Sequence, residues 1–386
     1  MADLPLPDAD ARAHSERVVA HIRDAIAAAG GWIPFARYMD LALYAPGLGY
    51  YAAGATKIGA AGDFVTAPEL TPLFASAIAT QVAAILAATQ RREIVELGGG
   101  SGRLAADLLN ALSVRNSLPA RYAILEPSPE LRERQRATIA RLAAAHLARV
   151  DWLDGLPGTI DGAVVANEVL DAVPAHVVAR RGGQWSERGV GWDEARGNFA
   201  WADRPADARI AALASRRFPA DRDYVSEINP AAEALVEELG RRLEGGAALF
   251  MDYGFPAAEY YHPQRDQGTL MCHYRHRAHA DPFLWPGLAD ITAHVDFTAM
   301  AEAGERAGLP VAGYTAQAPF LIGCGILDAL KAVGAPDSTA YIKAAGPVQK
   351  LLSPAEMGEL FKVIALAKSE TIEWPGFALA DRRHRL

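Results

Sequence analysis

Cysteine is scarce in this 386-residue chain, which contains only Cys272 and Cys324. Two cysteines make no disulfide framework, so the sequence favours a reducing compartment. Basic residues are also outnumbered: the chain has 38 lysine and arginine residues and 46 aspartate and glutamate residues, which gives a formal net charge of −8. Nucleic-acid binding needs a concentrated basic face, so this balance argues against a nucleic-acid partner.

Long apolar runs are missing as well. No stretch has the roughly 20 apolar residues of a membrane-spanning helix, so we expect no stable membrane insertion. The N-terminus carries Asp3, Asp8 and Asp10 ahead of any basic residue, unlike a secretory signal or an acid-poor transit peptide. These absences predict a cytoplasmic protein. The composition, with 51% hydrophobic and 22% charged residues, is ordinary for a globular protein and compatible with a monomer or a homodimer.

The chain is organised around residues 92–109. This stretch predicts a short apolar strand that ends in Glu96-Leu97, a glycine turn over 98–102, and an amphipathic helix. A strand that feeds a helix through glycines forms the ligand-binding corner of an open α/β sheet, because glycine lets a ligand approach the backbone closely.

The spacing of the glycines selects the ligand. A dinucleotide-binding G-x-G-x-x-G turn would need a glycine where this chain has Arg103, whereas Gly98, Gly100 and Gly102 follow Glu96 in the pattern E-x-G-x-G-x-G. A carboxylate suits a cationic ligand and suits a pyrophosphate poorly. S-adenosylmethionine has a sulfonium and an ammonium group and no phosphate, so the pattern favours a methyl-donor site. A lone glycine motif is weak, and an ordinary tight turn is the alternative.

Later strands repeat the acidic ending. The predicted strand 121–126 ends in Glu126, at the spacing from Gly98 that places a carboxylate beside a ribose in adenosine-binding α/β folds. The alternative is a simple charged strand end. A third strand over 150–153 contains Asp151 and Trp152; the indole lies where an adenine ring could rest, and a place in the core is equally compatible.

The central strands predict the acceptor side of the site. Strand 161–168 ends in Asn167-Glu168 and is followed by Asp171, and strand 245–253 contains Asp252. Polar groups at the carboxyl ends of central strands lie over the crevice where open sheets bind ligands. For Asp171, a role as the cap of a following helix is an equal alternative.

The remaining chain is assigned by periodicity and turn residues. We expect a loose tail over 1–12, a surface loop over 59–69, an antiparallel insertion over about 173–226, an irregular lid over about 255–290, and a last apolar strand over 361–368 that could pair as an antiparallel edge. Helices are expected over 15–29, 34–44, 73–88, 130–147, 230–243, 297–307, 320–333 and 341–352, and a further strand over 311–316.

Within the expected lid, Cys272, His273, His276 and His279 resemble metal ligands. Zinc sites take their ligands from two separated pairs, and no second pair follows here. The pattern therefore favours a solvated or substrate-facing basic loop, and we expect no metal.

Blocks of mixed chemistry, in fixed order over nearly the whole chain, resemble the MidA family, the relatives of the mitochondrial complex I assembly methyltransferase. They are Gly62–Glu69 (GDFVTAPE), Glu96–Gly102 (ELGGGSG), Glu126–Pro129 (EPSP), Ala166–Pro174 (ANEVLDAVP), Met251–Gly254 (MDYG), Ala289–Phe297 (ADITAHVDF) and Met357–Lys362 (MGELFK). The chain departs from the family at Gly99-Gly100-Ser101, where relatives often have a Pro and an Arg. It also departs at Val169-Leu170, where they often have two aromatics bordering the acceptor pocket.

The resemblance implies a class I S-adenosylmethionine-dependent methyltransferase: a Rossmann-like, mostly parallel α/β sheet with an antiparallel edge strand, a helical N-terminal extension and inserted antiparallel strands. Residues 1–90 would form the extension and 91–386 the cofactor-binding domain. The loop 62–69 would close over the methionine end of the cofactor. Family members resemble protein arginine methyltransferases that act on a subunit of respiratory complex I.

Residues and resemblance together give the predicted site. The cofactor-binding residues are Asp63, Phe64, Thr66, Glu96, Gly98, Gly100, Gly102, Glu126, Pro127, Asp151, Trp152 and Asn167, and the catalytic candidates are Glu168 and Asp171, then Glu69, Asp252 and Asp290. The alternatives are a non-catalytic assembly factor that binds S-adenosylmethionine and a small-molecule methyltransferase. A nicotinamide-dependent reductase fits least well.

Overall fold

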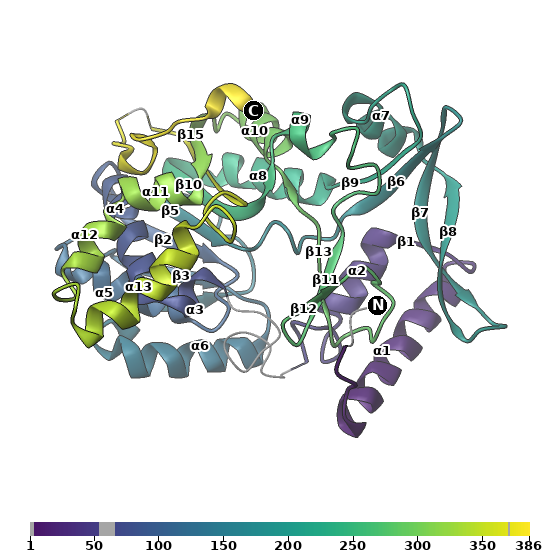
Figure 1. Cartoon of the computed structure of the whole chain (residues 1–386), viewed down its shortest axis with the longest axis horizontal. Coiled ribbons are helices and arrows are strands. Elements are labelled where there is room, and N and C mark those ends of the chain that lie inside the picture. Colours follow the sequence, from purple (N-terminus) through teal and green to yellow (C-terminus); the bar gives the residue numbers. More distant parts are fainter. Residues whose placement is uncertain (1–3, 54–65, 370) are drawn as a thin grey trace. The chain divides into compact units, whose positions relative to one another are not determined.

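The computed structural model describes residues 4–53, 66–369 and 371–386. The chain divides into two compact units (Figure 1). The first unit comprises Met1–Phe64, Leu170–Glu233 and Phe255–Asp296, and the second comprises Val65–Val169, Ala234–Gly254 and Phe297–Leu386. The expected boundary near residue 90 stays a prediction.

The second unit is built on a mixed sheet with the strand order β15-β16-β10-β5-β2-β3-β4. The strands β10, β5, β2, β3 and β4 run parallel to one another, whereas β16 is antiparallel to both β10 and β15. The bounds are β2 Glu93–Leu97, β3 Arg121–Leu125, β4 Val150–Leu153, β5 Ile160–Asn167, β10 Leu243–Phe255, β15 Val311–Ala316 and β16 Phe361–Ala367. The predicted α/β sheet, mostly parallel with an antiparallel strand, is confirmed.

The position of the last strand differs from the expectation. The run 361–368 is expected at an edge, but β16 pairs on both sides and β15 forms the edge. All residues of β16 are buried. A strand that is apolar on both faces is stabilised inside a sheet, where neighbours on either side satisfy its backbone.

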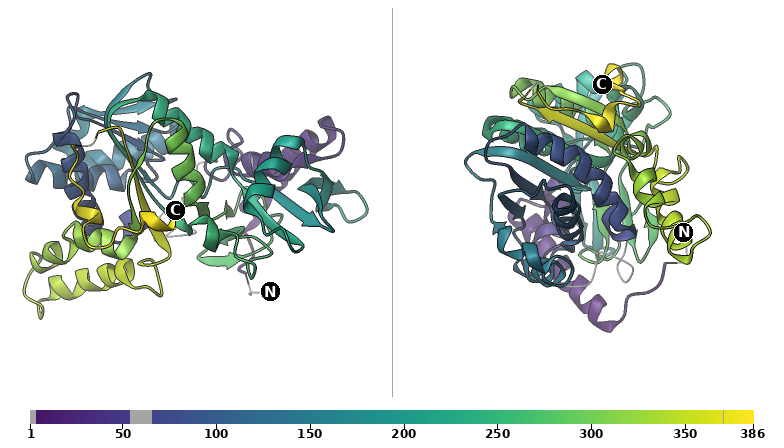
Figure 2. Two further views of the ribbon diagram at one scale, coloured as in Figure 1. Left: turned by 90° about the horizontal axis from the view of Figure 1, so that it is seen from above. Right: turned by 90° about the vertical axis from the view of Figure 1, so that its left-hand side faces the viewer.

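Helices complete the second unit. Their bounds are α3 Ala67–Leu70, α4 Pro72–Ala87, α5 Arg103–Val114, α6 Pro129–Leu142, α10 Phe297–Arg306, α11 Gln317–Gly323, α12 Ile326–Lys331 and α13 Thr339–Leu352; α8 Pro230–Arg242 leads into β10. Figure 2 shows α12 and α13, coloured lime, lying together beside the sheet. The hydroxyl of Thr71 accepts the backbone N–H of Leu73 and caps α4, whose first residue is a proline.

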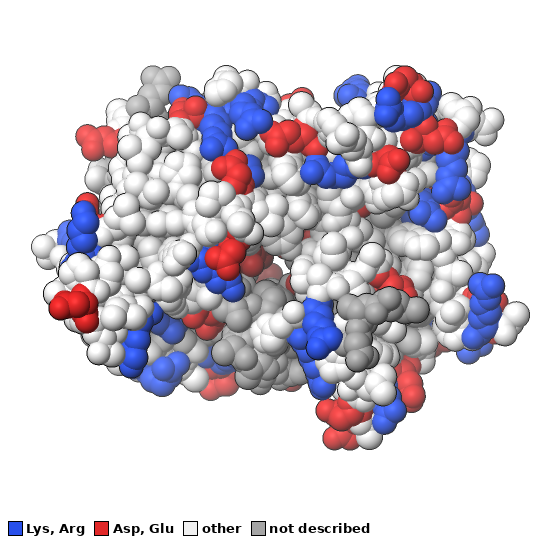
Figure 3. Space-filling model, in the orientation of Figure 1, with Lys and Arg blue, Asp and Glu red and all other residues white. Residues whose placement is uncertain are grey.

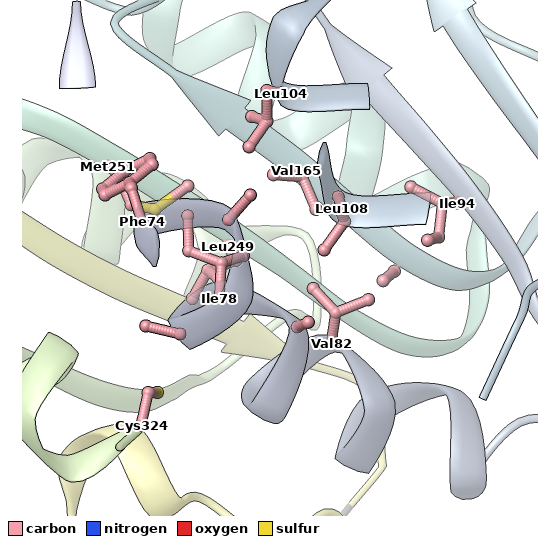
Figure 4. Packing of buried hydrophobic residues seen from close by; sticks show 14 of the residues in the cluster. Phe74, Ile78, Val82, Ile94, Leu104, Leu108, Val165, Leu249, Met251 and Cys324 are labelled. Carbon is pink, nitrogen blue, oxygen red and sulfur yellow. The ribbon is translucent and has the colours of Figure 1, made fainter. Parts of the chain in front are cut away.

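The core of the second unit lies between α4, α5 and the sheet (Figure 4). Side chains of several elements meet there, and most are fully buried. They include Phe74, Ile78 and Val82 of α4, Leu104 and Leu108 of α5, Ile94 of β2, Val165 of β5, and Leu249 and Met251 of β10. Strand β2 is thereby held in a rigid apolar setting.

Three helix predictions need correction. The helix α1 spans Ala9–Ala28, so part of the expected tail is helical; the Asp8 carboxylate caps it by accepting the N–H of Ala11. The expected helix 320–333 is broken at Gly325, whose φ of 87° lies in the left-handed region and separates α11 from α12. The helix expected to reach 147 stops at Leu142 and is followed by a 3₁₀ turn.

The first unit combines helices with antiparallel strands. A five-stranded sheet contains β1 Ile33–Pro34, β6 His176–Arg181, β7 Gln184–Asp193, β8 Asn198–Pro205 and β9 Tyr224–Ile228. The expected inserted antiparallel strands are confirmed, although the insertion also contains a helix that the pattern does not predict, α7, Ala208–Arg217. The short helix α2 spans Phe35–Tyr44.

The segment expected to be irregular is partly regular. β11 Met271–Tyr274 pairs with β12 Arg277–His279 and with β13 Asp290–Thr292, so the expected lid contributes β11, β12 and the first residue of β13 to a three-stranded antiparallel sheet. The short helix α9, Ala257–Tyr260, precedes it. The prolines and histidines of this segment make its short strands hard to recognise in the sequence. Pairing between the strands stabilises them in the fold.

We predict that truncating a core side chain of β10 destabilises the protein strongly. Leu249 is fully buried, so Leu249→Ala should lower the free energy of unfolding by about 2–5 kcal/mol, since it removes apolar contacts and leaves a cavity. The matched control is Leu379→Ala, at a side chain that is 61% exposed, where a change within about 0.5 kcal/mol is expected. Urea denaturation measures both; equal losses would contradict this account of the core.

Candidate active site

The site is placed at the carboxyl ends of the central parallel strands. Strand β2 pairs with β3 on one side and with β5 on the other, with Leu97 opposite Leu125 and opposite Ala166. The strand order therefore reverses beside β2, which is where open α/β sheets bind their ligands. Gly98 directly follows β2 and Glu126 directly follows β3, whereas Asn167 is the last residue of β5.

The glycine turn after β2 needs its glycines. Gly98, Gly100 and Gly102 have φ values of 65°, 50° and 82°, which are costly for other residues. A Cβ on Gly102 would lie 2.8 Å from the Cα of Gln135 in α6, closer than packed atoms approach. The turn is therefore pressed against the protein on one side, and Arg103 begins α5 directly after it.

Glu96 is a buried carboxyl at the end of β2. It is 2% exposed and its Oε2 accepts the hydroxyl of Tyr122 at 2.9 Å. Burial raises the pKa of Glu96 to about 8, and the charge of Glu126 adds to this, while the Tyr122 hydrogen bond opposes it. A cationic group nearby would favour the ionised form of such a carboxyl.

Asn167 adds a second group suited to a cationic ligand. Its Nδ2 donates to the Oε1 of Glu168 at 3.0 Å. Its Oδ1 is buried and has no hydrogen-bond partner within the part of the chain that the structure describes. An unpaired buried oxygen is costly, so it suits a donor such as an ammonium group. With Glu96 and the glycine turn, Asn167 fits the amino-acid half of S-adenosylmethionine.

Glu126 is held in one orientation after β3. It is 5% exposed; its Oε1 accepts the backbone N–H of Ser128 and its Oε2 accepts the Nε2 of Gln135, both at 3.0 Å. Burial raises its pKa, and the hydrogen bonds from Ser128 and Gln135 and the nearby Arg132 lower it. Such a fixed carboxylate suits the paired hydroxyls of a ribose. Pro127 lies between Glu126 and Ser128.

The two candidates on β4 differ in their surroundings. Trp152 packs against the core cluster, and its indole Nε1 donates to the Oε1 of Gln135 at 2.8 Å. Its partial packing in the core and its polar contact are compatible with both predictions from the sequence, a core residue and a support for an adenine ring. Asp151 is exposed and forms an ion pair with Arg121 of β3 at 2.7 Å, which accounts for its position without a ligand. The cofactor roles of both residues stay predictions.

Among the catalytic candidates, Glu168 has the most unusual backbone. Its φ of 54° is left-handed, which costs a non-glycine residue energy and often accompanies function. Its N–H donates to the carbonyl of Met251 at 2.9 Å. Its carboxylate accepts both the Nδ2 of Asn167 and, at 3.3 Å, the backbone N–H of Ala67. The side chain is therefore oriented by its neighbours.

Two further acids of the second unit bind protein groups nearby. Asp252 is 1% exposed, and its two oxygens accept the N–H groups of Val169 and Tyr253 at 3.0 and 2.9 Å. It thereby fixes the backbone that follows Glu168. Glu69 accepts the hydroxyl of Ser101 and so links α3 to the glycine turn.

Asp171 and Asp290 belong to the first unit. The chain after β5 forms a turn and reaches β6 without a helix, so the helix-cap interpretation of Asp171 is wrong. Its carbonyl accepts the N–H of Ala293 at 3.0 Å, and Asp290 accepts the hydroxyl of Tyr51 at 3.0 Å. Burial raises the pKa of Tyr51, and Asp290, Tyr44 and Asp171 add to the shift.

The loop predicted to cover the cofactor is only partly described. Asp63 and Phe64 lie outside the described residues. Thr66 precedes α3, Ala67–Leu70, so the last residues of the expected loop are helical; Pro68 lies in the first turn of α3, where its fixed φ suits a helix start. The covering role stays a prediction.

Sequence reasoning missed two residues of this site, Gln135 and Tyr122. Gln135 is the buried polar side chain of α6, and Ile139, one turn later, shares its buried face. That spacing in an otherwise charged helix is a usable signal. Tyr122 gives no signal, because an aromatic residue inside a strand is ordinary.

Other surfaces offer fewer leads. Cys272 is buried, and burial raises the pKa of its thiol. Over the described ranges, no group of histidine, cysteine and acidic side chains could hold a metal ion. On the face in Figure 3, described acidic and basic side chains are interspersed. None of the described helices has both the length and the apolar character to cross a membrane.

This strand order, with an acid and a glycine turn at the end of its central strand, defines the class I S-adenosylmethionine-dependent methyltransferase fold. A family model described as "Putative S-adenosyl-L-methionine-dependent methyltransferase" matches residues 77–315. The chain belongs to this family, the MidA family that its motifs resemble.

Two kinds of relative support this membership. A crystal structure of a superfamily member from Burkholderia thailandensis, bound to S-adenosyl-homocysteine, is 52% identical, with a TM-score of 0.94 and full coverage of both chains. Protein arginine methyltransferase NDUFAF7 of Mus musculus is 31% identical, over 87% of this chain and 81% of its own length. The human protein of that name is 29% identical, over 89% and 82%. S-adenosylmethionine is thus the cofactor of this protein.

We predict that a side chain at the glycine turn weakens cofactor binding. Gly102→Ala adds a Cβ at a left-handed φ and against α6, a strain of about 1–3 kcal/mol that should cost roughly tenfold or more in affinity for S-adenosylhomocysteine. Gly155→Ala is the control, because nothing lies within 4 Å of the position that its added methyl group would take and its φ is not left-handed. Calorimetry compares them; similar affinities would argue against this turn as the binding site.

We also predict a pH dependence that Glu96 causes. Because its folded-state pKa is raised to about 8, the folded protein retains a proton that the unfolded chain releases above its ordinary value of 4.5. The free energy of unfolding should therefore fall as pH rises between these values, by up to about 1.4 kcal/mol per pH unit from this group. Glu96→Gln should flatten that slope. Urea denaturation at pH 5.5 and 8 tests it, and identical slopes would refute it.

Proposed function

We propose that this protein transfers a methyl group from S-adenosylmethionine to an arginine guanidinium of a protein substrate. Glu168, an oriented carboxylate on a strained backbone directly after β5, carries the proposal. The arginine methyltransferases of mouse and human add support, at about 30% identity. The family resemblance extends the proposal to a respiratory complex I subunit as substrate, with a cytoplasmic site of action.

The cofactor half of the site holds the donor. When bound, S-adenosylmethionine supplies an electrophilic methyl group on its sulfonium. In our proposal Glu96 and the Oδ1 of Asn167 bind its ammonium group, and Glu126 binds the ribose hydroxyls. Gly98 and Gly100 leave room for the ligand to approach the backbone closely. Since methyl transfer is an in-line displacement, the protein contributes mainly position and electrostatics.

The acceptor half must handle a cation. A guanidinium has a pKa above about 12 and arrives protonated, so carboxylates have to orient it and help remove a proton. Glu168 performs the orientation in this proposal. Asp171 follows it by three residues in the chain and is the second candidate. Asp252 acts indirectly, because both its oxygens hold the backbone next to Glu168.

We predict that Glu168→Gln separates catalysis from cofactor binding. Loss of the carboxylate should lower kcat for methylation of an arginine-containing substrate by about a hundredfold or more, in line with other catalytic acids and bases. Affinity for S-adenosylhomocysteine should change by less than about threefold, because the proposed ligand contacts of Asn167 remain. The control is Glu302→Gln, an exposed position in α10. Unchanged kcat for Glu168→Gln would exclude Glu168.

The assay itself tests the reaction class. Purified protein is incubated with methyl-labelled S-adenosylmethionine and candidate substrates, including complex I subunits, and methylarginine is identified by mass spectrometry. Calorimetry with S-adenosylmethionine, S-adenosylhomocysteine and NAD runs in parallel. Binding without transfer to any protein or metabolite would favour the non-catalytic assembly factor, and label in a metabolite would favour a small-molecule methyltransferase.

A further inference from the structure

Helix α6 contains a fully buried glutamine. Gln135 is 0% exposed in a helix whose other polar residues lie at least partly in solvent. A buried amide must satisfy its donors and its acceptor within the protein, or folding loses the free energy of its hydration. The partners of Gln135 therefore show what its position requires.

Two of its three partners, Glu126 and Trp152, belong to the predicted nucleoside half of the site, and the third is a carbonyl of the glycine turn. The Oε1 accepts the indole N–H of Trp152 at 2.8 Å, and the Nε2 donates to the Oε2 of Glu126 at 3.0 Å and to the carbonyl of Gly100 at 3.1 Å. An indole N–H can only donate, so Trp152 determines which way the amide faces. The amide NH₂ must then face two acceptor oxygens.

The packing around Gln135 reinforces these hydrogen bonds. A Cβ on Gly99 would lie 3.1 Å from the Nε2 of Gln135, and a Cβ on Gly102 would lie 2.8 Å from its Cα. The glycine turn thus rests directly on this residue. The guanidinium of Arg136, the next residue of α6, lies 4.3 Å from the centroid of the Trp152 ring and adds a cation–π contact to β4.

We propose that Gln135 is a positioning residue that couples the nucleoside-binding residues Glu126 and Trp152 to each other and to the glycine turn. The inference rests on the cofactor role proposed above for Glu126 and on the role that the sequence predicts for Trp152. Gln135 acts through these residues: its amide directs one carboxylate oxygen of Glu126, fixes the edge of the indole and holds the carbonyl of Gly100. The contributions of Glu126 and Trp152 to cofactor affinity are therefore interdependent.

The first test removes the amide and keeps the shape. Gln135→Met is unbranched and similar in length, yet cannot make the three hydrogen bonds. Affinity for S-adenosylhomocysteine should fall about tenfold to hundredfold, as for hydrogen bonds to charged groups. Affinity for 5′-methylthioadenosine, which lacks the amino-acid half, should also fall, because Glu126 and Trp152 lose their hydrogen bonds to Gln135. The matched control is Gln349→Met, at an exposed glutamine of α13. Unchanged affinities, or a loss confined to S-adenosylhomocysteine, would overturn the inference.

The second test gives a signature that a merely structural role would not. Gln135→Glu retains an acceptor for Trp152 but sets a second carboxyl against Glu126. At pH 8 the two carboxylates repel, so affinity should fall further than in Gln135→Met. Near pH 5 the pair shares a proton, and a carboxyl O–H replaces the amide donor, so affinity relative to the wild type should recover several-fold. An equal loss at both pH values would overturn the inference.

Two companion variants separate this inference from the proposed site. Trp152→Phe keeps a ring but lacks the N–H, so it should lose several-fold in affinity. In the double variant with Gln135→Met it should cause little further loss, because Gln135→Met already removes the hydrogen bond to Trp152. If Gln135→Met fails to fold, this variant and the pH signature decide. If Glu126→Gln binds S-adenosylhomocysteine as the wild type does, the proposed nucleoside site is refuted. If Glu126→Gln binds more weakly but Gln135→Met binds normally, the nucleoside site stands and only the positioning role of Gln135 is refuted.

Discussion

The parallel pairing of β2 with β3 on one side and with β5 on the other is the constraint on which the site depends. Because matching positions of parallel strands reach the same edge, the pairing brings Gly98, Glu126 and Asn167 together from distant parts of the chain. Burial of all five residues of β2 makes the register strict. A slip by one residue would turn Glu96 to the opposite face, away from Tyr122.

The carboxyl groups of the site differ in environment more than in kind. Glu96 is buried with one hydroxyl donor, and its pKa is raised to about 8. Burial also raises the pKa of Glu126, but two hydrogen-bond donors and Arg132 oppose this shift. Glu168 is oriented by an amide and a backbone N–H on a strained backbone. Different protein surroundings thus give chemically similar side chains different proton affinities and orientations, which is the basis of the separate roles proposed for them.

The sequence predicted most of the elements of the sheet, because buried parallel strands are continuous apolar runs bounded by polar ends. Its errors follow from contacts that no local pattern contains. The run 361–368 is apolar at any position in a sheet, and only its pairing with β10 and β15 makes it interior. Gly325 breaks a helix because its φ is left-handed, and a single glycine in the sequence does not predict that conformation. The partners of Asp171 are likewise distant in sequence.

For the site, the acids at strand ends and the glycine turn were predictable, since they depend on position within a strand and turn. Gln135 was not, because its three partners come from β4, the end of β3 and the glycine turn, and they meet only when α6 packs on the sheet. By itself the sequence indicated an open α/β sheet with a methyl-donor turn through local periodicity and spacing, and its motif blocks indicated the family and its fold class. Only the tertiary structure decided which buried groups share hydrogen bonds and how their charge is stabilised, because desolvation and hydrogen-bond geometry depend on neighbours that folding brings together.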